Sequence, residues 1–367
     1  MCIRDRIKTP DWVKNAVFYQ IFPDRCARSQ PTKKGQWQAS VLEGWDATPT
    51  MQGYKGGNLW GVIDKLDYLK DLGINAVYFT PIFQSASNHR YHTHDYYLVD
   101  PILGGNVAFE ALIEAAHHKN IKVVLDGVFN HASRGFFFFN DILENGPYSP
   151  WLDWFKILDW PLSPYDGEKP ANYVSWYDNR ALPQFNHDNP QVKEYIMQIG
   201  EYWLNKGIDG WRLDVPNEVE TPGFWEEFRD RVKAVNPDAY IVGEIWSDAS
   251  KWLDGNQFDG VMNYLFTIPT IAFTAGDRFD PQYAQPYYEP HPAISAKEYA
   301  ERIKHLLELY PEEIKLAQLN LLNSHDTPRL ISTVGEDKST MELATVLLLS
   351  LIHISQPTRP SKSTRMP

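Results

Sequence analysis

Short apolar segments typical of β-strands alternate with segments of helical periodicity along most of this 367-residue chain. Leu59, Val62 and Leu66 keep helical spacing, and after Gly73 comes an apolar run at residues 74–79. The seven strand-like segments are residues 16–22, 74–79, 121–125, 207–214, 240–244, 261–263 and 316–323. Repeated strand–helix units predict a parallel sheet. Seven units at this length predict an α/β fold, a (β/α)8 TIM barrel truncated before its eighth strand, rather than an open doubly wound sheet.

The interval at residues 131–189 breaks this alternation and is rich in aromatic residues. It follows the third strand-like segment, at the end of the barrel where such folds place their sites. An insertion of this length is usually functional or a small subdomain. We therefore predict an inserted domain at 131–189, between two parts of the barrel at residues 7–130 and 190–349. Most of its aromatic side chains are expected to form a small core of their own.

The two ends of the chain differ from the rest. Residues 1–6 and 350–367 resemble translated adapter sequence, and the tail is basic within an acidic chain. We set both segments aside from fold reasoning, with a natural disordered tail as the alternative. If the ends are foreign, the natural protein extends further on both sides and its own N-terminus is absent. A cytoplasmic location is favoured, because no signal-peptide core is visible.

Composition and net charge argue against several classes of protein and of binding partner. Acidic residues outnumber basic ones by 47 to 35, and the net charge of −12 argues against a nucleic acid or an anionic membrane. The longest apolar stretch, residues 343–354, is interrupted by polar residues and is too short to span a bilayer. Two cysteines exclude a disulfide scaffold. Aromatic residues make up 14% of the chain, and those left at the surface suit stacking on sugar rings.

Polar residues collect where four of the predicted strands end. They are residues 126–131, residues 210–214, Glu244 and residues 323–326. Each alone is a weak signal, because an aspartate at the end of a strand is often a helix cap. Together they indicate one site, because the carboxyl ends of parallel barrel strands meet at one face.

The residue types at this face indicate acid–base chemistry. Arg212 and Asp214 are two apart, so a strand points both side chains to the same side. We expect the arginine to lower the pKa of Asp214 and keep it ionised, as a nucleophile requires. Glu244 ends the next strand, and a strand spacing of ~4.8 Å permits carboxyl groups about 5 Å apart, as in retaining glycosidases. Apolar packing would raise the pKa of Glu244, as suits a general acid. The alternative for Arg212 and Asp214 is an internal salt bridge.

These motifs resemble those of glycoside hydrolase family 13, the α-amylase family. Four segments match its signature regions in order: residues 126–131, 210–218, 243–246 and 323–326. The resemblance runs from about residue 9 to about residue 349. It implies that Asp214 is the nucleophile, Glu244 the general acid/base, and Asp326 the carboxylate that holds sugar hydroxyls. It also implies that Arg212 orients the nucleophile.

Four further residues are implied to bind the sugar that is cleaved. The resemblance assigns His131 and His325 to its hydroxyl groups and Tyr91 to stacking beneath it, with His89 nearby. Finer features resemble the neopullulanase, cyclomaltodextrinase and maltogenic amylase branch. The resemblance to this branch implies that Asn217, Glu218 and Trp246 line the leaving-group side of the site. The departures from that branch are Pro216, Ser247 and Phe185, which leave the specificity open. Members of the branch usually carry an N-terminal domain that forms dimers, so a homodimer is implied for the whole protein.

No organic cofactor is implied, and calcium is left open. Many family members bind calcium through the asparagine that matches Asn130, and others through a loop after the first strand. Here that loop, residues 26–31, lacks the Asn and Asp ligands that a hard cation prefers. His92 and His94 share one face of a strand and could be read as a transition-metal site, with a hydrogen-bonded loop as the alternative.

The resemblance therefore implies a retaining α-glucan hydrolase. Its substrates would be α-1,4 links, and also α-1,6 links, in maltooligosaccharides, cyclodextrins or starch. One alternative keeps the same site but transfers the glycosyl group to another sugar. A second alternative is a non-catalytic binding or transporter-accessory relative, which predicts damage to the catalytic set. An open barrel edge raises the further question of whether the truncated chain folds.

Overall fold

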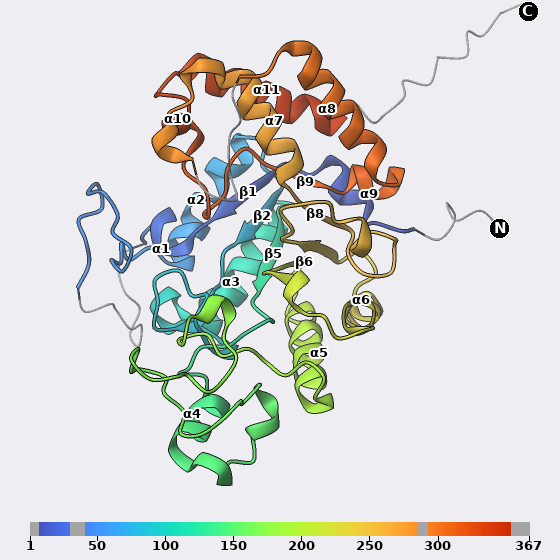
Figure 1. The fold of residues 1–367 in the computed structure, drawn as a ribbon. Coiled ribbons are helices and arrows are strands. Elements are labelled where there is room, and N and C mark those ends of the chain that lie inside the picture. The colour runs from blue at the N-terminus through green and yellow to red at the C-terminus, as the bar shows by residue number, and fades with distance from the viewer. Residues whose placement is uncertain (1–6, 30–40, 285–292, 354–367) are drawn as a thin grey trace, which may run out of the picture.

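A curled sheet of seven parallel strands forms the centre of the molecule in the computed structural model, which describes residues 7–29, 41–284 and 293–353 (Figure 1). The strands are β1 (Phe18–Ile21), β2 (Ala76–Phe79), β5 (Lys122–Gly127), β6 (Gly210–Leu213), β7 (Tyr240–Gly243), β8 (Gly260–Asn263) and β9 (Leu319–Asn320). Each pairs with the next one in that order, so all their carboxyl ends lie at one edge. The prediction of a parallel α/β sheet is confirmed, and each predicted strand overlaps one of these, although β5 and β8 extend beyond the predicted bounds.

Helices cover the outer side of this sheet (Figure 1). The longer ones are α2 (Leu59–Asp71), α3 (Gly105–His118), α5 (Pro190–Asn205), α6 (Phe224–Val235), α7 (Tyr264–Ala275), α8 (Ala296–Leu309) and α11 (Lys338–His353). The short ones are α1 (Pro23–Cys26), α4 (Phe137–Asn145), α9 (Glu312–Leu316) and α10 (Leu330–Thr333). Successive helices pack side by side, as α2 does on α3 and α5 on α6. Their apolar faces help to bury both sides of β2, β6, β7 and β8, whose residues are all buried, whereas Tyr19 of β1 is exposed.

Alternate residues of β2, β5 and β7 enter two different hydrophobic clusters. Val123 and Ile241 belong to the large cluster that also contains the buried faces of the helices. Tyr78, Val124 and Val242 belong to a second cluster on the inner side of the curled sheet. This alternation follows from the two-residue period of a strand. It also decides which polar residues at the strand ends face inward.

Two features of the fold lie outside the predicted pattern. Strands β3 (Phe83–Ser85) and β4 (Thr93–Val99) form a separate antiparallel pair between β2 and α3. Helix α7 is apolar on nearly all sides and contains Pro269, so it has no amphipathic period to detect. Within the described part of the chain, no helix combines the length and apolar character needed to cross a bilayer.

Residues 131–189 pack against the β3–β4 pair through aromatic side chains. Phe136 and Phe185 contact Tyr96 of β4, with ring centroids 5.7 and 6.2 Å apart. The buried aromatic residues of this segment belong to the same hydrophobic cluster as Phe129 beside the sheet. The expectation of a separate small core is therefore wrong for these side chains. The domain boundaries, and the foreign origin of the ends, stay predictions, and residues 1–6 and 354–367 lie outside the described residues.

A groove separates the two outer strands of the sheet, β1 and β9. It encloses about 590 Å³ that is partly open to solvent. Its lining comes from both edges and from α11: Val13, Ala16, Val17, Phe18, Lys315, Leu316, Gln318, Leu319, Asn320, Leu348 and Leu349. The sheet order gives neither β1 nor β9 a partner on this side among the described residues.

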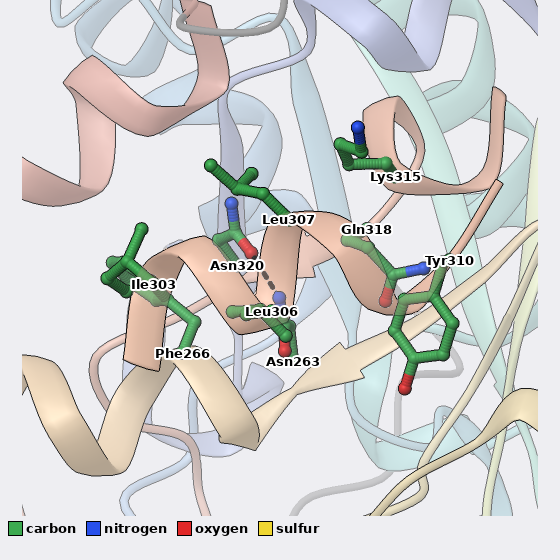
Figure 2. A pocket seen from close by; sticks show the side chains of 9 residues that line it. All are labelled: Asn263, Phe266, Ile303, Leu306, Leu307, Tyr310, Lys315, Gln318 and Asn320. Atoms are coloured by element: carbon green, nitrogen blue, oxygen red, sulfur yellow. Dashed lines mark hydrogen bonds between the residues drawn. The ribbon is translucent and has the colours of Figure 1, made fainter. Parts of the chain in front are cut away.

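Figure 2 shows a second pocket, between α8 and the strands β8 and β9. Side chains from α7, α8 and the β9 region line it, and Asn263 Nδ2 donates a hydrogen bond to Asn320 Oδ1 at 2.8 Å. No carboxylate lines this pocket. The chemistry predicted from the strand ends therefore lies elsewhere, inside the curl of the sheet.

Candidate active site

The candidate site lies at the carboxyl ends of β5, β6 and β7, on the inner side of the sheet. Asp126 is two residues beyond Val124, and Glu244 is two residues beyond Val242, so both carboxyl groups point inward. The register pairs Asp126 with Arg212 and Leu213 with Gly243. Asp214 and Glu244 therefore follow next on neighbouring strands, as predicted.

The guanidinium of Arg212 joins three carboxyl groups. Its Nη1 lies 2.9 Å from Asp126 Oδ1 and 2.8 Å from Asp214 Oδ1, and its Nη2 lies 2.9 Å from Glu244 Oε2. All four side chains are buried, and Arg212 has no exposed surface. Nη1 donates hydrogen bonds to Asp126 and Asp214, whereas Nη2 faces Glu244 Oε2 as an ion pair without hydrogen-bond geometry. One buried cation thus lies against both carboxyl groups that the sequence proposed as nucleophile and acid.

The expected pKa of Asp214 is wrong in direction. Burial, partly opposed by Arg212, raises the pKa of Asp214 to about 7 and that of Asp126 to about 6. Burial also raises the pKa of Glu244, as expected. The physical reason is that one guanidinium faces three buried carboxyl groups, so its charge cannot balance all of them. The cluster therefore retains protons near neutral pH.

The backbone after Asp214 is bent sharply at Val215. This β-branched residue has φ 36° and ψ 50°, in the left-handed region that such residues avoid. Its N–H donates to Glu244 Oε2 at 3.2 Å, and Trp246 Nε1 donates to Glu244 Oε1 at 3.3 Å. Two donors from different segments therefore orient the Glu244 carboxyl group. Backbone strain of this kind persists where the surrounding structure enforces it, often at functional sites.

A chain of hydrogen bonds links the fourth motif to the first. Gln20 Nε2 donates to His325 Nδ1 at 2.8 Å, so the other ring nitrogen carries the proton. His325 Nε2 lies 2.6 Å from the Tyr91 hydroxyl, which donates to Asp126 Oδ2 at 2.7 Å. The ring of Tyr91 is nearly parallel to that of His325. Burial lowers the pKa of His325 well below its usual value, so the ring is neutral.

Asp326 stands at the open side of the cluster. Its side chain is 41% exposed, and its Oδ2 lies 3.2 Å from His325 Nε2. Partial burial and the Glu244 carboxylate raise the pKa of Asp326 to about 7. The three carboxyl groups proposed as catalytic are thus brought together, with Asp326 nearest to solvent.

Two further predicted histidines lie beside the cluster. His131 is 1% exposed and stacks on Trp176 at 5.2 Å between ring centroids. His131 Nε2 and Trp176 Nε1 have no hydrogen-bond partner among the described residues. Burial lowers the pKa of His131 to about 3 and that of His89 to about 4. Both rings are neutral at physiological pH, which suits hydrogen bonding to hydroxyl groups.

A family model described as alpha amylase, catalytic domain, matches residues 20–358. The chain belongs to the α-amylase family. It is similar to the maltogenic alpha-amylase of Bacillus acidopullulyticus, with 42% identity over 349 residues that cover 95% of this chain and 56% of that protein. It is similar to a cyclomaltodextrinase of Geobacillus thermopakistaniensis, with 44% identity over 342 residues that cover 92% of this chain and 54% of that protein.

Among solved structures, this α-amylase-family chain is similar to the debranching enzyme from Nostoc punctiforme. The identity is 68% and the TM-score 0.87, over 94% of this chain and 71% of that one. The resemblance to the maltogenic amylase and cyclomaltodextrinase branch is confirmed. The chain spans little more than half the length of the two curated relatives, 56% and 54%. The family match also extends past residue 350, where the segment set aside as foreign begins.

The residues predicted for the leaving-group side of this α-amylase-family site lie on the loops after β6 and β7. Asn217 and Glu218 are exposed on the 3-10 turn Pro216–Glu218, and Asn217 Nδ2 donates to Glu218 Oε1 at 3.0 Å. The half-buried Trp246 stacks on Tyr264 with ring centroids 3.7 Å apart. Trp246 is thus fixed against the first residue of α7 while it contacts Glu244.

At one of the two places considered for calcium, Asn130 Oδ1 accepts a hydrogen bond from Gln184 Nε2 at 2.9 Å. The other place, the loop at residues 26–31, lies partly outside the described residues. Calcium binding at either place stays a prediction. Among the residues that the structure describes, no group of three or more His, Cys, Asp or Glu side chains is placed to hold a metal, the His92–His94 pair included.

Three contributors to the site were missed in the sequence. Asp126 lies in the first signature segment, residues 126–131, but nothing in the spacing shows that it and Asp214 both form ion pairs with Arg212. Gln20 lies in β1 and faces inward, and the two-residue period of that strand was a usable signal. Trp176 was counted only among the aromatic residues of the 131–189 segment. No local pattern places it on His131.

Removing the Tyr91 hydroxyl tests the hydrogen-bonded chain. We expect Tyr91→Phe to lower the free energy of unfolding by about 1–2 kcal/mol, because Asp126 and His325 each lose a buried partner. Urea unfolding at pH 7 measures the change. Tyr148→Phe, at a residue that is 93% exposed, is the matched control and should leave the stability unchanged. Equal stability of Tyr91→Phe and the unmodified chain would contradict the network.

Proposed function

We propose that this site hydrolyses α-glucans with retention of configuration at the anomeric carbon. The observation that carries the proposal is that one guanidinium, that of Arg212, fixes Asp214 and Glu244 on adjacent strands with Asp326 beside them. Carboxyl groups about 5 Å apart are the arrangement of retaining glycosidases. Intact pairing of this kind argues against a non-catalytic relative.

In the proposed reaction, an oxygen of Asp214 attacks the anomeric carbon while Glu244 donates its proton to the departing glycosidic oxygen. The raised pKa of Glu244 keeps that proton available near neutral pH. A covalent glycosyl ester on Asp214 forms. Glu244, now ionised, takes a proton from water, and the resulting hydroxide releases the sugar. For Asp214 to act as nucleophile it must be ionised, and Arg212 Nη1 favours that form.

The remaining site residues are proposed to bind the sugar. Asp326 would accept hydrogen bonds from sugar hydroxyls and favour the distorted transition state. The neutral rings of His131 and His325 would bind hydroxyl groups, and the half-buried Tyr91, with His89 beside it, would stack under the ring. Asn217, Glu218 and Trp246 would line the leaving-group side.

We propose α-1,4 links as substrates and α-1,6 links in addition. The names of the relatives support this range, because one is a cyclomaltodextrinase and another, at 68% identity, is a debranching enzyme. Transfer of the glycosyl group to a second sugar uses the same covalent ester. It would replace water by an acceptor hydroxyl bound near Trp246.

For the whole protein we propose a closed (β/α)8 barrel, an inserted domain at residues 131–189 and a homodimer in the cytoplasm. The groove between β1 and β9 supports an eighth strand, because both strands lack a neighbour there within the described residues. The cytoplasmic location is supported by the name of one relative, the intracellular maltogenic amylase of Bacillus subtilis.

A time course of product anomers on β-cyclodextrin tests the proposed reaction. We expect proton NMR to show α-configured reducing ends first, with β anomers appearing later by mutarotation. Glu244→Gln should remove this signal without unfolding the chain. First appearance of β anomers would refute retention. A folded chain that binds maltooligosaccharide but releases no product would favour the binding alternative.

A further inference from the structure

The ammonium group of Lys55 is buried among oxygen atoms near the end of β1. The residue is 4% exposed. Its Nζ donates to Gly44 O at 2.7 Å and to Ala47 O at 2.6 Å, and it lies 3.3 Å from Glu43 Oε2. An ammonium carries three N–H donors, so each has an oxygen to face. We call these three oxygens the oxygen cage.

The backbone of the same lysine is tied to the core. Asp24, which has no exposed surface, accepts from Lys55 N at 2.8 Å and from Gly56 N at 3.0 Å. Asp24 lies in α1, directly after β1. Lys55 is therefore anchored to the barrel by its backbone, while its side chain reaches into the loop at residues 43–54. Lys55 therefore connects the loop at residues 43–54 to the core around Asp24.

The loop at residues 43–54 folds around Glu43. Thr50 N donates to Glu43 Oε1 at 3.1 Å, and Glu43 N donates to Tyr54 O at 2.9 Å. A Cβ at Gly53 would come within 1.8 Å of Glu43 Oε1, so a larger residue there would displace this carboxylate. The Glu43 carboxylate thus binds the loop backbone with one oxygen and faces the Lys55 ammonium with the other.

The loop supports the segment that carries Tyr91. Asn88 is 3% exposed, and its Nδ2 donates to Met51 O at 3.0 Å and to Gly53 O at 2.7 Å. Asn88 immediately precedes His89, and two residues later comes Tyr91, whose hydroxyl contacts Asp126. A shift of the loop would therefore move the acceptors of Asn88 and loosen the segment at residues 88–91.

We propose that the Lys55 ammonium acts as an internal cation that folds residues 43–54 and so positions His89 and Tyr91. Carbonyl and carboxylate oxygens are the ligands that a hard metal ion prefers, and here a side chain of the protein satisfies them. Lys55 is a positioning residue, because it acts through Asn88 on the site. The loop therefore needs no calcium. Only the consequence for glucan binding rests on the proposed function.

Hydrogen exchange measures the loop without reference to activity. In the full chain, we expect Lys55→Met to speed exchange of the amides of residues 43–57 by about 10-fold or more, because local opening becomes easier. Exchange in α5 and α6 should stay unchanged. Lys297→Ala, at a lysine side chain that is 85% exposed, is the matched control and should leave the loop protected.

Chemical rescue separates the charge from the packing. Lys55→Ala removes a propyl chain and its ammonium, so n-propylammonium ions should restore part of the protection of residues 43–57. 1-Propanol, which has the same shape without the charge, should not. Equal rescue by both compounds would overturn the proposal, as would full protection in both Lys55 variants. Loss of protection in the unmodified chain on treatment with a calcium chelator would overturn it too.

Glucan binding supplies the second readout. We expect Lys55→Met to weaken maltotriose binding, measured by calorimetry, on the order of 10-fold through loss of the ordered 88–91 segment. Unchanged binding alongside faster loop exchange would overturn the positioning role. A chain that binds no maltotriose even when unmodified, but whose loop exchange responds as predicted, would instead count against the proposed function and leave the internal cation supported.

Discussion

Replacing Asp214 with Asn should abolish glucan hydrolysis and, at pH 8, make the folded chain more stable. An enzyme that loses its nucleophile is expected to lose on the order of 10⁴-fold or more in kcat. Stability should rise because burial raises the pKa of Asp214 to about 7 in the folded state, from 3.8. Ionising it therefore costs folding free energy, and the amide carries no such cost.

The sign and the pH range of this effect follow from proton binding. Between about pH 4 and pH 7 the folded chain holds a proton on Asp214 that the unfolded chain has lost, so stability falls as pH rises through that range. The gain from Asp214→Asn should be about 1–2 kcal/mol above pH 7 after allowing for the weakened bond to Arg212, and it should fade toward pH 4.

Thermal unfolding at pH 8 and pH 5 measures the stability of Asp214→Asn, and hydrolysis of β-cyclodextrin measures its activity. Asp67→Asn, at a side chain that is 82% exposed, is the matched control and should change neither quantity. Full activity of Asp214→Asn would remove it from the catalytic set. A loss of stability that is greater at pH 8 than at pH 5 would contradict the raised pKa.

Replacing Arg212 with Met should destabilise the chain most at high pH and eliminate activity. The change leaves Asp126, Asp214 and Glu244 buried without their shared cation. Removing one partner of a buried ion pair costs about 3–5 kcal/mol. The loss should shrink toward pH 5, because the three carboxyl groups take up protons once the guanidinium is gone.

Urea unfolding between pH 5 and pH 8 measures this dependence. Arg229→Met is the matched control, because Arg229 pairs with Asp259 at 2.8 Å while Lys233 also holds that carboxylate at 2.9 Å. We expect the control to lose less stability and to keep its activity. If Arg212→Met does not fold, Arg212→Lys should show a smaller loss of the same pH dependence. A loss of stability that does not depend on pH would contradict the role of Arg212 as the shared cation of the three carboxyl groups.

The strands and their order were predictable because hydrophobic pattern and chain topology determine them. The runs at residues 123–125 and 240–242 are apolar on both faces, which is the pattern of a parallel strand buried between helices and barrel interior. The two-residue period of these strands also predicts that the side chains of Asp126 and Glu244 point inward. Helix α7 escaped prediction because Pro269 and its apolar surface obscure its period.

The electrostatics of the site were not predictable from neighbours in sequence. Glu244 has no basic residue near it in the chain, yet Arg212 Nη2 lies 2.9 Å away across the sheet. Asp214 has an arginine two residues away, yet burial determines the direction of its pKa. The pKa values of Asp214 and Glu244 both depend on how many carboxyl groups contact the Arg212 guanidinium. The register of β5, β6 and β7 determines how many do.

The most direct test of the account is to trap the covalent ester. Glu244→Gln leaves the nucleophile in place but lacks the acid/base, so α-maltosyl fluoride, whose fluoride leaves without a proton, should load the enzyme faster than water unloads it. Mass spectrometry of the digested protein should find a maltosyl group on the peptide that contains Asp214, and on no other. A maltosyl group on a different carboxylate, or rapid turnover to β-maltose with no adduct, would contradict the account.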